Sequence, residues 1–357
     1  MQSILLATAI ALVVGLTLTP WVIDFFRARG IGELIREDGP ATHFVKHGTP
    51  TMGGLVLMIA ATLGYAAAHL RIGGGLRFQA FAPAGVLVLV VAWILAFIGA
   101  LDDLAKIQRT RSLGLSKRAK LIGQTVAGFV LAYGALDWTG LESSIAWAGT
   151  PIDWLPPLPN IVFAVWVVFM IVGTSNGVNL SDGVDGLASG SAAMGFFVFT
   201  IIAFWEFRNP EVYLQLEPVG QSGLLDVAVV SASLLGACIG FLWWNAAPAR
   251  IIMGDTGALA LGGALAALAL FTRTHLLLGV IGGLFVLETL SVIIQVIAYR
   301  GFDGRRVFAM APVHHHFELR GWAEFTVIVR FWLFAALTAG LGLALFYMDF
   351  IAKGGTE

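Results

Sequence analysis

The sequence contains little charge and almost no cysteine. Asp, Glu, Lys and Arg make up 12% of the 357 residues and hydrophobic residues 58%, whereas soluble domains average roughly 25% charged residues. The single cysteine, Cys238, lies in an apolar run, which excludes a disulfide framework and a cysteine-based zinc site. The net charge of −1 gives no reason to expect a nucleic-acid partner. This composition is typical of an integral membrane protein.

Two common nucleotide-binding motifs are also missing. No G-x-x-x-x-G-K-[ST] segment is present, which excludes a P-loop ATPase. No G-x-G-x-x-G segment opens a βαβ unit, so a dinucleotide-binding fold is not expected either.

About ten apolar runs are long enough to cross a bilayer, which takes roughly 20 residues per helix. We therefore predict an all-α, polytopic membrane protein that forms one domain over residues 1–357. The fifth and eighth runs are the short ones. The expected spans are 2–26, 52–70, 82–101, 120–137, 160–175, 186–205, 224–243, 257–272, 276–298 and 326–348.

Lys and Arg are distributed very unevenly between the connections that join these spans. Of the 21 Lys and Arg residues, 16 lie in or beside the odd-numbered connections and 5 on the opposite side. Because cytoplasmic loops are enriched in Lys and Arg, the odd-numbered connections are predicted to be cytoplasmic. Both termini are then expected to lie outside.

The third span ends in two adjacent carboxylates, Asp102 and Asp103, followed by Lys106. If the helix continues by one turn, Asp103 and Lys106 share a face. Adjacent carboxylates repel unless a cation lies near them, and Mg²⁺ prefers oxygen ligands. Taken alone, the same stretch is equally consistent with a helix end that carries charge where it leaves the membrane.

Five polar clusters occur, and all of them fall in odd-numbered connections, where topology brings them to one face. Carboxylates and lysines around a hard cation suit a phosphorylated substrate, and a phosphate acceptor at the bilayer edge suggests a lipid phosphate. A membrane transporter, the alternative from another class, would be expected to place polar groups along the membrane midplane. The clusters are 46–54, 102–120, 176–186, 245–255 and 312–318.

Taken together and in order, five motifs resemble the polyprenyl-phosphate N-acetylhexosamine-1-phosphate transferases, and among them the phospho-N-acetylmuramoyl-pentapeptide transferase (MraY) family. The histidine segment favours this branch over its alternative, a sister transferase with a UDP-GlcNAc-type donor. The motifs are Gly48-Thr49-Pro50-Thr51-Met52-Gly53-Gly54, Asp102-Asp103-x-x-Lys106, Asn176-x-x-Asn179-Leu180-Ser181-Asp182-Gly183-Val184-Asp185-Gly186, Met253-Gly254-Asp255 and Pro312-x-His314-His315-His316-Phe317-Glu318.

The resemblance implies an activity: Mg²⁺-dependent transfer of phospho-MurNAc-pentapeptide from UDP-MurNAc-pentapeptide to undecaprenyl phosphate. The products would be lipid I and UMP, in the first membrane step of peptidoglycan synthesis. It also implies a homodimer in the bacterial plasma membrane with the active site facing the cytoplasm.

The resemblance also implies roles for single residues. Asp255 is the expected main Mg²⁺ ligand, and Asp102 and Asp103 are candidates for general base or for positioning the lipid phosphate and metal. Direct attack is favoured over an aspartyl-phosphate intermediate, because a phosphate monoester (second pKa about 6) is already mostly ionised near neutral pH. Both routes stay open at this stage. The expected substrate-binding residues are Lys46, Thr51, Lys106, Lys120, Asn176, Asn179, Asp182, Asp185, His314, His315 and His316.

Some of these residues have a structural alternative. Asp182 and Asp185 each precede a glycine, and Asp-Gly is a turn signal. The three consecutive histidines would lie about 100° apart on a helix, so we expect one or two to contact substrate and the rest to be structural. Glu288 lies inside an apolar run and is expected to support a broken helix, while His69 is expected at the membrane interface.

Two positions depart from the family pattern, which reads F-M-G-D-x-G-S. Here Ile252 stands where the pattern has an aromatic residue, and Ala258 stands where it has a serine. The resemblance places the aromatic side chain near the uracil base. Recognition of the base is therefore expected to differ, whereas metal binding by Asp255 is not affected.

Overall fold

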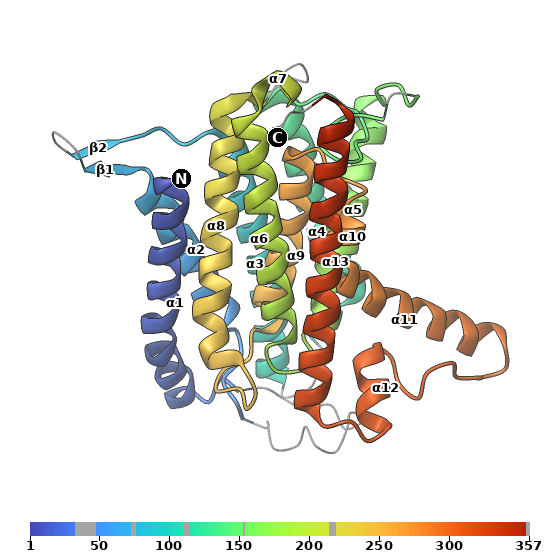
Figure 1. Cartoon of the computed structure of the whole chain (residues 1–357). Helices are drawn as coiled ribbons and strands as arrows, with labels where there is room; N and C mark the ends of the chain where they lie inside the picture. Colours follow the sequence, from blue (N-terminus) through green and yellow to red (C-terminus); the bar gives the residue numbers. More distant parts are fainter. Residues whose placement is uncertain (33–47, 73–75, 110–113, 153, 214–218, 355–357) are drawn as a thin grey trace.

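The computed structural model describes the chain except residues 33–47, 73–75, 110–113, 153, 214–218 and 355–357, and it shows a bundle of roughly parallel helices (Figure 1). The all-α prediction is confirmed. Within the described residues, nine helices are long and apolar enough to cross a membrane, and α2 (Gly54–Ala68) is a shorter apolar helix. The nine are α1 (Gln2–Ala28), α3 (Pro83–Arg109), α4 (Lys117–Tyr133) with its π-helical continuation η2 (Gly134–Trp138), α5 (Asn160–Ser181), α6 (Leu187–Arg208), α8 (Gly220–Asn245), α9 (Gly254–Phe271), α11 (Gly283–Gly301) and α13 (Glu324–Ala352).

Short elements connect the long helices. An antiparallel hairpin of β1 (Leu70–Ile72) and β2 (Leu76–Phe78) follows α2 and projects from the bundle (Figure 1). The remaining short helices are α7 (Pro210–Tyr213), α10 (Leu278–Ile281) and α12 (Val313–Leu319).

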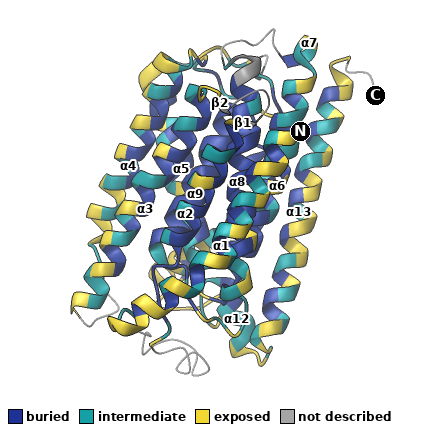
Figure 2. Cartoon of the chain, turned by 90° about the vertical axis from the view of Figure 1, so that its left-hand side faces the viewer, coloured by how far each residue is buried: buried dark blue, intermediate teal, exposed yellow. Residues whose placement is uncertain are grey.

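Helix α9 forms the centre of the bundle, where Figure 2 shows the buried residues concentrated. All its residues from Thr256 to Phe271 are buried, and α3 and α5 pack along it. Small residues allow such close approach between helices. A Cβ on Gly262 would lie 2.4 Å from Ser175 Cα of α5, and one on Gly99 of α3 would lie 2.2 Å from the Asp255 carbonyl oxygen. This packing holds the first turn of α9 against the ends of α3 and α5.

Two helix boundaries differ clearly from the prediction. The carboxylates Asp102 and Asp103 were expected in a connection, but α3 continues past them to Arg109. Helix α5 runs to Ser181, so the expected short fifth span has 22 residues and includes Asn176. In both cases polar side chains interact with neighbouring helices, which lets the helix continue beyond its apolar run.

The ninth span is broken, in line with the expectation of a broken helix there. Gly282 ends α10 and begins α11. Helix α11 then leaves the bundle at an angle (Figure 1). Helix α12 lies at the end of the bundle opposite to the N-terminus and the C-terminal end of α13. The placement of both termini outside the membrane stays a prediction.

Candidate active site

Three carboxylates form a cluster at the end of the bundle where α12 lies. Asp102 and Asp103 come from α3 and Asp255 from the first turn of α9. One oxygen of each lies within 4.8 Å of the others. Asp102 is 1% exposed and Asp103 is 2% exposed. Buried carboxylates require compensating positive charge, so their neighbours decide what the cluster can do.

Two lysines supply part of that charge. Lys106 Nζ lies 2.8 Å from Asp102 Oδ2, 3.3 Å from Asp103 Oδ1 and 3.1 Å from Asp255 Oδ1. Lys120 Nζ lies 3.3 Å from Asp102 Oδ1 and also contacts Asp255 Oδ2. The continuation of α3 therefore places Lys106 on the face of the carboxylates, as the i, i+3 spacing predicted. Three carboxylates against two ammonium groups leave one negative charge.

This donor set fits a hard divalent cation. All three ligand side chains offer carboxylate oxygens, which Mg²⁺ prefers over nitrogen or sulfur. The oxygens already converge on one cationic group, the Lys106 ammonium, at 2.8–3.3 Å. The cluster is thus a possible metal-binding site.

Asp103 also caps helix α9. It accepts hydrogen bonds from the backbone N–H of Asp255 (3.2 Å) and of Thr256 (3.0 Å), and from the Thr256 hydroxyl (2.7 Å). Gly254, at φ +71°, makes this approach possible, because a Cβ there would lie 2.6 Å from Asp103 Oδ2. The positive end of the helix dipole therefore faces the carboxylates. Sequence reasoning missed Thr256, because its partner is 153 residues away.

A line of amides connects α4 and α5 to the cluster. Asn179 Nδ2 donates to Asp255 Oδ1 at 2.9 Å. One turn earlier, Asn176 Nδ2 donates to Gln124 Oε1 at 3.2 Å, and Gln124 Nε2 donates to Ser175 Oγ at 2.9 Å. The structure thus brings Asn179 directly to the carboxylates, while Asn176 lies one turn behind it.

The two Asp-Gly aspartates lie in the turn after α5. Asp182 forms the C-cap of α5. Asp185 is buried, and its Oδ2 accepts from the Ala249 backbone N–H at 2.9 Å. Its own N–H donates to Glu324 Oε1 at 3.3 Å. Asp185 therefore connects this turn to the connection before α9 and to α13.

The three histidines of α12 have three different partners. His314 is fully buried, and its Nδ1 lies 3.0 Å from Glu288 Oε1 of α11. His315 Nδ1 lies 2.7 Å from Glu318 Oε2. His316 Nδ1 accepts from the Ala309 backbone N–H at 3.0 Å. The contact of Glu288 is thus with α12, and its expected support of the helix break at Gly282 stays a prediction.

The histidine segment approaches the turn after α5. A Cβ on Gly183 would lie 2.6 Å from His314 Nε2 and 3.3 Å from His315 Nε2. Two of the three histidines thus lie beside Gly183, while the Nδ1 of His316 is hydrogen-bonded to the Ala309 N–H. Two expected site residues remain. Thr51 is buried, with its hydroxyl beside Gly254 and without a hydrogen-bond partner among the described residues. Lys46 lies outside the described residues.

A match to a known family identifies this polytopic membrane protein as a glycosyl transferase. The family described as "Glycosyl transferase family 4" matches residues 85–273, which include all three clustered aspartates. The class is therefore that of a membrane glycosyl transferase.

Relatives refine this class. The phospho-N-acetylmuramoyl-pentapeptide-transferase of Frankia casuarinae is 49% identical over 99% of this chain and 100% of its own length. Those of Mycobacterium avium and Mycobacterium leprae are 47% and 46% identical, again over 99% of this chain and 100% of their own. The chain therefore belongs to the phospho-N-acetylmuramoyl-pentapeptide-transferase family. The resemblance seen in the motifs is confirmed, and so is the enzyme hypothesis over the transporter.

Proposed function

We propose that the enzyme transfers phospho-MurNAc-pentapeptide from UDP-MurNAc-pentapeptide to undecaprenyl phosphate, giving lipid I and UMP. The observation that supports this most is the convergence of Asp102, Asp103 and Asp255 with Lys106 and Lys120 at the N-terminus of α9. Oriented positive charge of this kind stabilises transferring phosphoryl groups. The competing function is the sister reaction with a UDP-GlcNAc-type donor, and a comparison of the two donors distinguishes them.

The proposed chemistry is a displacement at the β-phosphorus of the sugar nucleotide. An oxygen of the lipid phosphate forms the new P–O bond, and the bond to the UMP oxygen breaks. Mg²⁺ held by Asp255 with Asp102 and Asp103 would neutralise negative charge on the diphosphate. Lys106 and Lys120 add positive charge on the same side, and Asp103 keeps the α9 N-terminus in place.

We assign the remaining residues to substrate binding. Asn179 offers its amide group beside the carboxylates, Asn176 lies one turn behind it, and Asp182 lies at the end of the same helix. Carboxylates there suit the N–H of a uracil base or ribose hydroxyls. His314 and His315 face the same turn and are placed for the sugar or phosphate. Lys46, Thr51 and Asp185 complete the proposed set, with His316 in a structural role.

We also propose the location of the enzyme. The cluster lies at the end of the bundle opposite to both chain ends, and Lys and Arg are concentrated in the connections on that side. The positive-inside rule then places the site at the cytoplasmic face of the bacterial plasma membrane. A homodimer, which the family resemblance implies, stays a prediction.

The first test measures UMP release by the purified full-length protein with undecaprenyl phosphate. UDP-MurNAc-pentapeptide and UDP-GlcNAc are compared as donors, each with Mg²⁺ and with EDTA. We expect turnover of the muramoyl donor alone, and only with the metal. Turnover of UDP-GlcNAc would instead assign the protein to the sister reaction. Metal-independent turnover would contradict the role given to the carboxylates.

Ile252 gives a prediction about the nucleoside. Its backbone is held in place, since its N–H donates to Pro50 O (2.7 Å) and its carbonyl accepts from Gly53 N–H (2.9 Å). Its side chain is half-buried. Ile252→Phe should therefore add a stacking surface without moving the chain, and lower the Kd of uridine ligands about 2- to 10-fold.

The matched control is Ile252→Leu, which changes shape without adding an aromatic ring. Calorimetry with UMP or a uridine inhibitor gives both Kd values. Equal or weaker binding by the phenylalanine variant would show that the base does not lie against position 252.

A further inference from the structure

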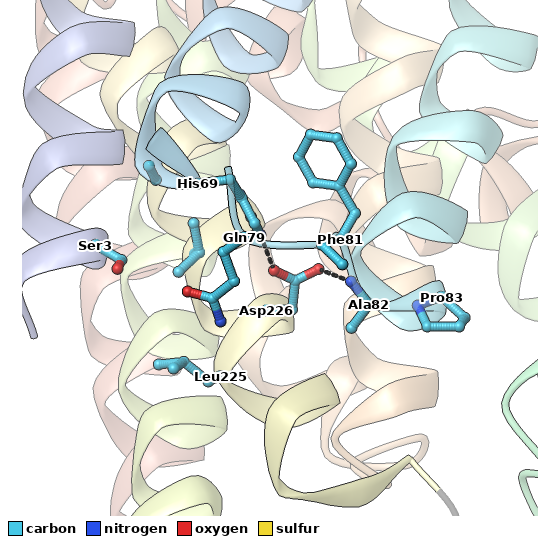
Figure 3. Close-up of a pocket in the computed structure, with 11 residues that line it drawn as sticks. Ser3, His69, Gln79, Phe81, Ala82, Pro83, Leu225 and Asp226 are labelled. Carbon is cyan, nitrogen blue, oxygen red and sulfur yellow. Dashed lines mark hydrogen bonds and ion pairs between the residues drawn. The ribbon is translucent and has the colours of Figure 1, made fainter. Parts of the chain in front are cut away.

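A second polar cluster lies at the other end of the bundle, where the sequence predicted only an interfacial histidine. His69 follows α2, and the structure buries it against Asp226 in the second turn of α8 (Figure 3). Each is 5% exposed. His69 Nε2 lies 2.6 Å from Asp226 Oδ1. The local sequence gave no sign of this pair, because its members are 157 residues apart. The transfer site at the opposite end does not use them.

The hydrogen bonds require a proton between the two side chains. His69 Nδ1 lies 2.9 Å from the Tyr65 carbonyl oxygen, which can only accept, so Nδ1 carries a hydrogen. A neutral imidazole would then point the lone pair of Nε2 at a carboxylate oxygen 2.6 Å away. Two such acceptors repel each other, so a further proton must lie between Nε2 and Asp226 Oδ1.

The other carboxylate oxygen indicates where the charge lies. Asp226 Oδ2 accepts from the Tyr65 hydroxyl and from the Ala82 backbone N–H (3.0 Å). Donors to a carboxylate favour its ionised form. The pair is therefore best described as a His69 imidazolium beside an Asp226 carboxylate. Moving the proton onto Asp226 would leave the number of bound protons, and hence the pH dependence, unchanged.

The cluster joins several parts of the fold at this end. The Gln79 N–H donates to the His69 carbonyl at 2.9 Å, which closes the stem of the β1–β2 hairpin. Asp226 of α8 holds Ala82 at the start of α3. A Cβ on Gly85 would lie 2.4 Å from Asp226 Oδ2, so the first turn of α3 presses on the cluster. Losing the His69–Asp226 contact would therefore loosen α2, α3, α8 and the hairpin together.

A cavity of about 380 Å³ borders the pair (Figure 3). The α1 helix lines it with Ser3, and the segment before α3 lines it with Gln79 and Phe81. The Phe81 ring centroid lies 4.5 Å from that of His69. Among the described side chains that face His69, the titratable ones are thus Tyr65 of α2 and Asp226 of α8. The titration of His69 depends on these two groups.

We propose that Tyr65, His69 and Asp226 form a proton-operated latch: one bound proton holds the hairpin stem and the adjoining ends of α2, α3 and α8 together, and its loss at higher pH releases them. The proposal does not depend on the proposed transfer reaction. Under the proposed orientation the latch lies at the outer face, so acidification outside the cell would tighten it.

The sign of the effect follows from linkage. Burial alone would lower the pKa of His69, but the hydrogen bonds to Asp226 and to the Tyr65 carbonyl, with the charge of Asp226, raise it above 6.5. A group whose pKa is raised in the folded state stabilises it fully below the unfolded pKa, here about 6.5. That stabilisation is lost as the pH rises through the folded pKa.

The test follows the Tm of the full-length protein in detergent from pH 6 to pH 9. Between pH 6 and pH 9 the Tm of the wild type should fall by about 2–4 °C more than the Tm of His69→Gln, because this variant lacks the titrating group. His275→Gln is the matched control at the same end of the bundle. Burial lowers the pKa of His275 to about 4, and its Nδ1 accepts from the Ala146 N–H at 3.3 Å. This histidine is neutral throughout, so its variant should keep the wild-type slope.

A second measurement uses only the wild-type protein and so does not depend on whether a variant folds. In wild-type protein with ¹⁵N-labelled histidine, NMR should find both ring nitrogens of His69 protonated at pH 6 and the ring losing a proton above pH 6.5. Equal Tm slopes in the wild type and His69→Gln would overturn the proposal. A His69 ring that carries a single proton at pH 6 would overturn it as well.

Discussion

Asp255→Asn is expected to lower kcat for UMP release about 1,000-fold, and to weaken metal binding. Asparagine has nearly the same size, so the effect reflects the lost charge and not a cavity. Asp255 contacts both lysines and accepts from Asn179 at 2.9 Å. Replacing its carboxylate by an amide would reduce the attraction for a divalent cation and place an NH2 donor against one of the two lysines, which contact opposite oxygens of Asp255.

One binding measurement and one control variant test this role of Asp255. Mn²⁺ binding, followed by electron paramagnetic resonance, reports on the carboxylates without any turnover. Asp303→Asn is the matched control, because Asp303 is exposed in the turn after α11. It adopts φ +46°, a conformation that asparagine tolerates well. If Asp255→Asn kept wild-type Mn²⁺ affinity and rate, the proposed role of the cluster would be wrong.

Much of the fold could be predicted because membrane spans depend on local composition. The apolar runs predicted the order of the helices, since each helix must satisfy its own backbone hydrogen bonds in lipid. Their number was predicted only approximately, because nine of the described helices are long and α2 is short. The boundaries were less predictable. Helix α3 continues through Asp102 and Asp103 because two lysines and the α9 N-terminus compensate the buried charges. Those partners come from other parts of the sequence and cannot be found from local periodicity.

The site, like the fold, could be predicted in part from local sequence, whereas its long-range contacts could not. Topology alone brought the polar connections to one end of the bundle, and the i, i+3 spacing placed Lys106 beside Asp103. The contacts that define the geometry are long-range: Thr256 with Asp103, and Glu288 with His314. The same holds for His69 with Asp226. For Asp103 and Glu288, a charged residue in or beside an apolar run indicated that a partner must exist, whereas nothing in the local sequence indicated the contacts of Thr256 and His69. Only the fold shows which residues meet.

Glu288→Ala is the second substitution for which we expect a large effect, a loss of about 10- to 100-fold in kcat. Glu288 and His314 are both fully buried, and Glu288 Oε1 lies 3.0 Å from His314 Nδ1. A carboxylate that accepts from Nδ1–H holds the ring in one orientation and leaves Nε2 as an acceptor. That Nε2 lies beside Gly183 and has no hydrogen-bond partner in the part of the chain that the structure describes. Without Glu288 the ring can turn and direct Nε2 away from the substrate.

Glu288→Gln distinguishes positioning from general stability. Its amide oxygen can still accept from Nδ1–H, so the ring should keep its orientation, and KM for the sugar nucleotide should stay near the wild-type value. If His314 takes up a proton or gains positive character in the reaction, kcat should fall in Glu288→Gln as well, because the amide cannot stabilise an imidazolium as a carboxylate does. If His314 only binds substrate, glutamine should restore kcat. A purely structural Glu288 would instead lower the Tm of both variants and leave kcat per folded enzyme unchanged.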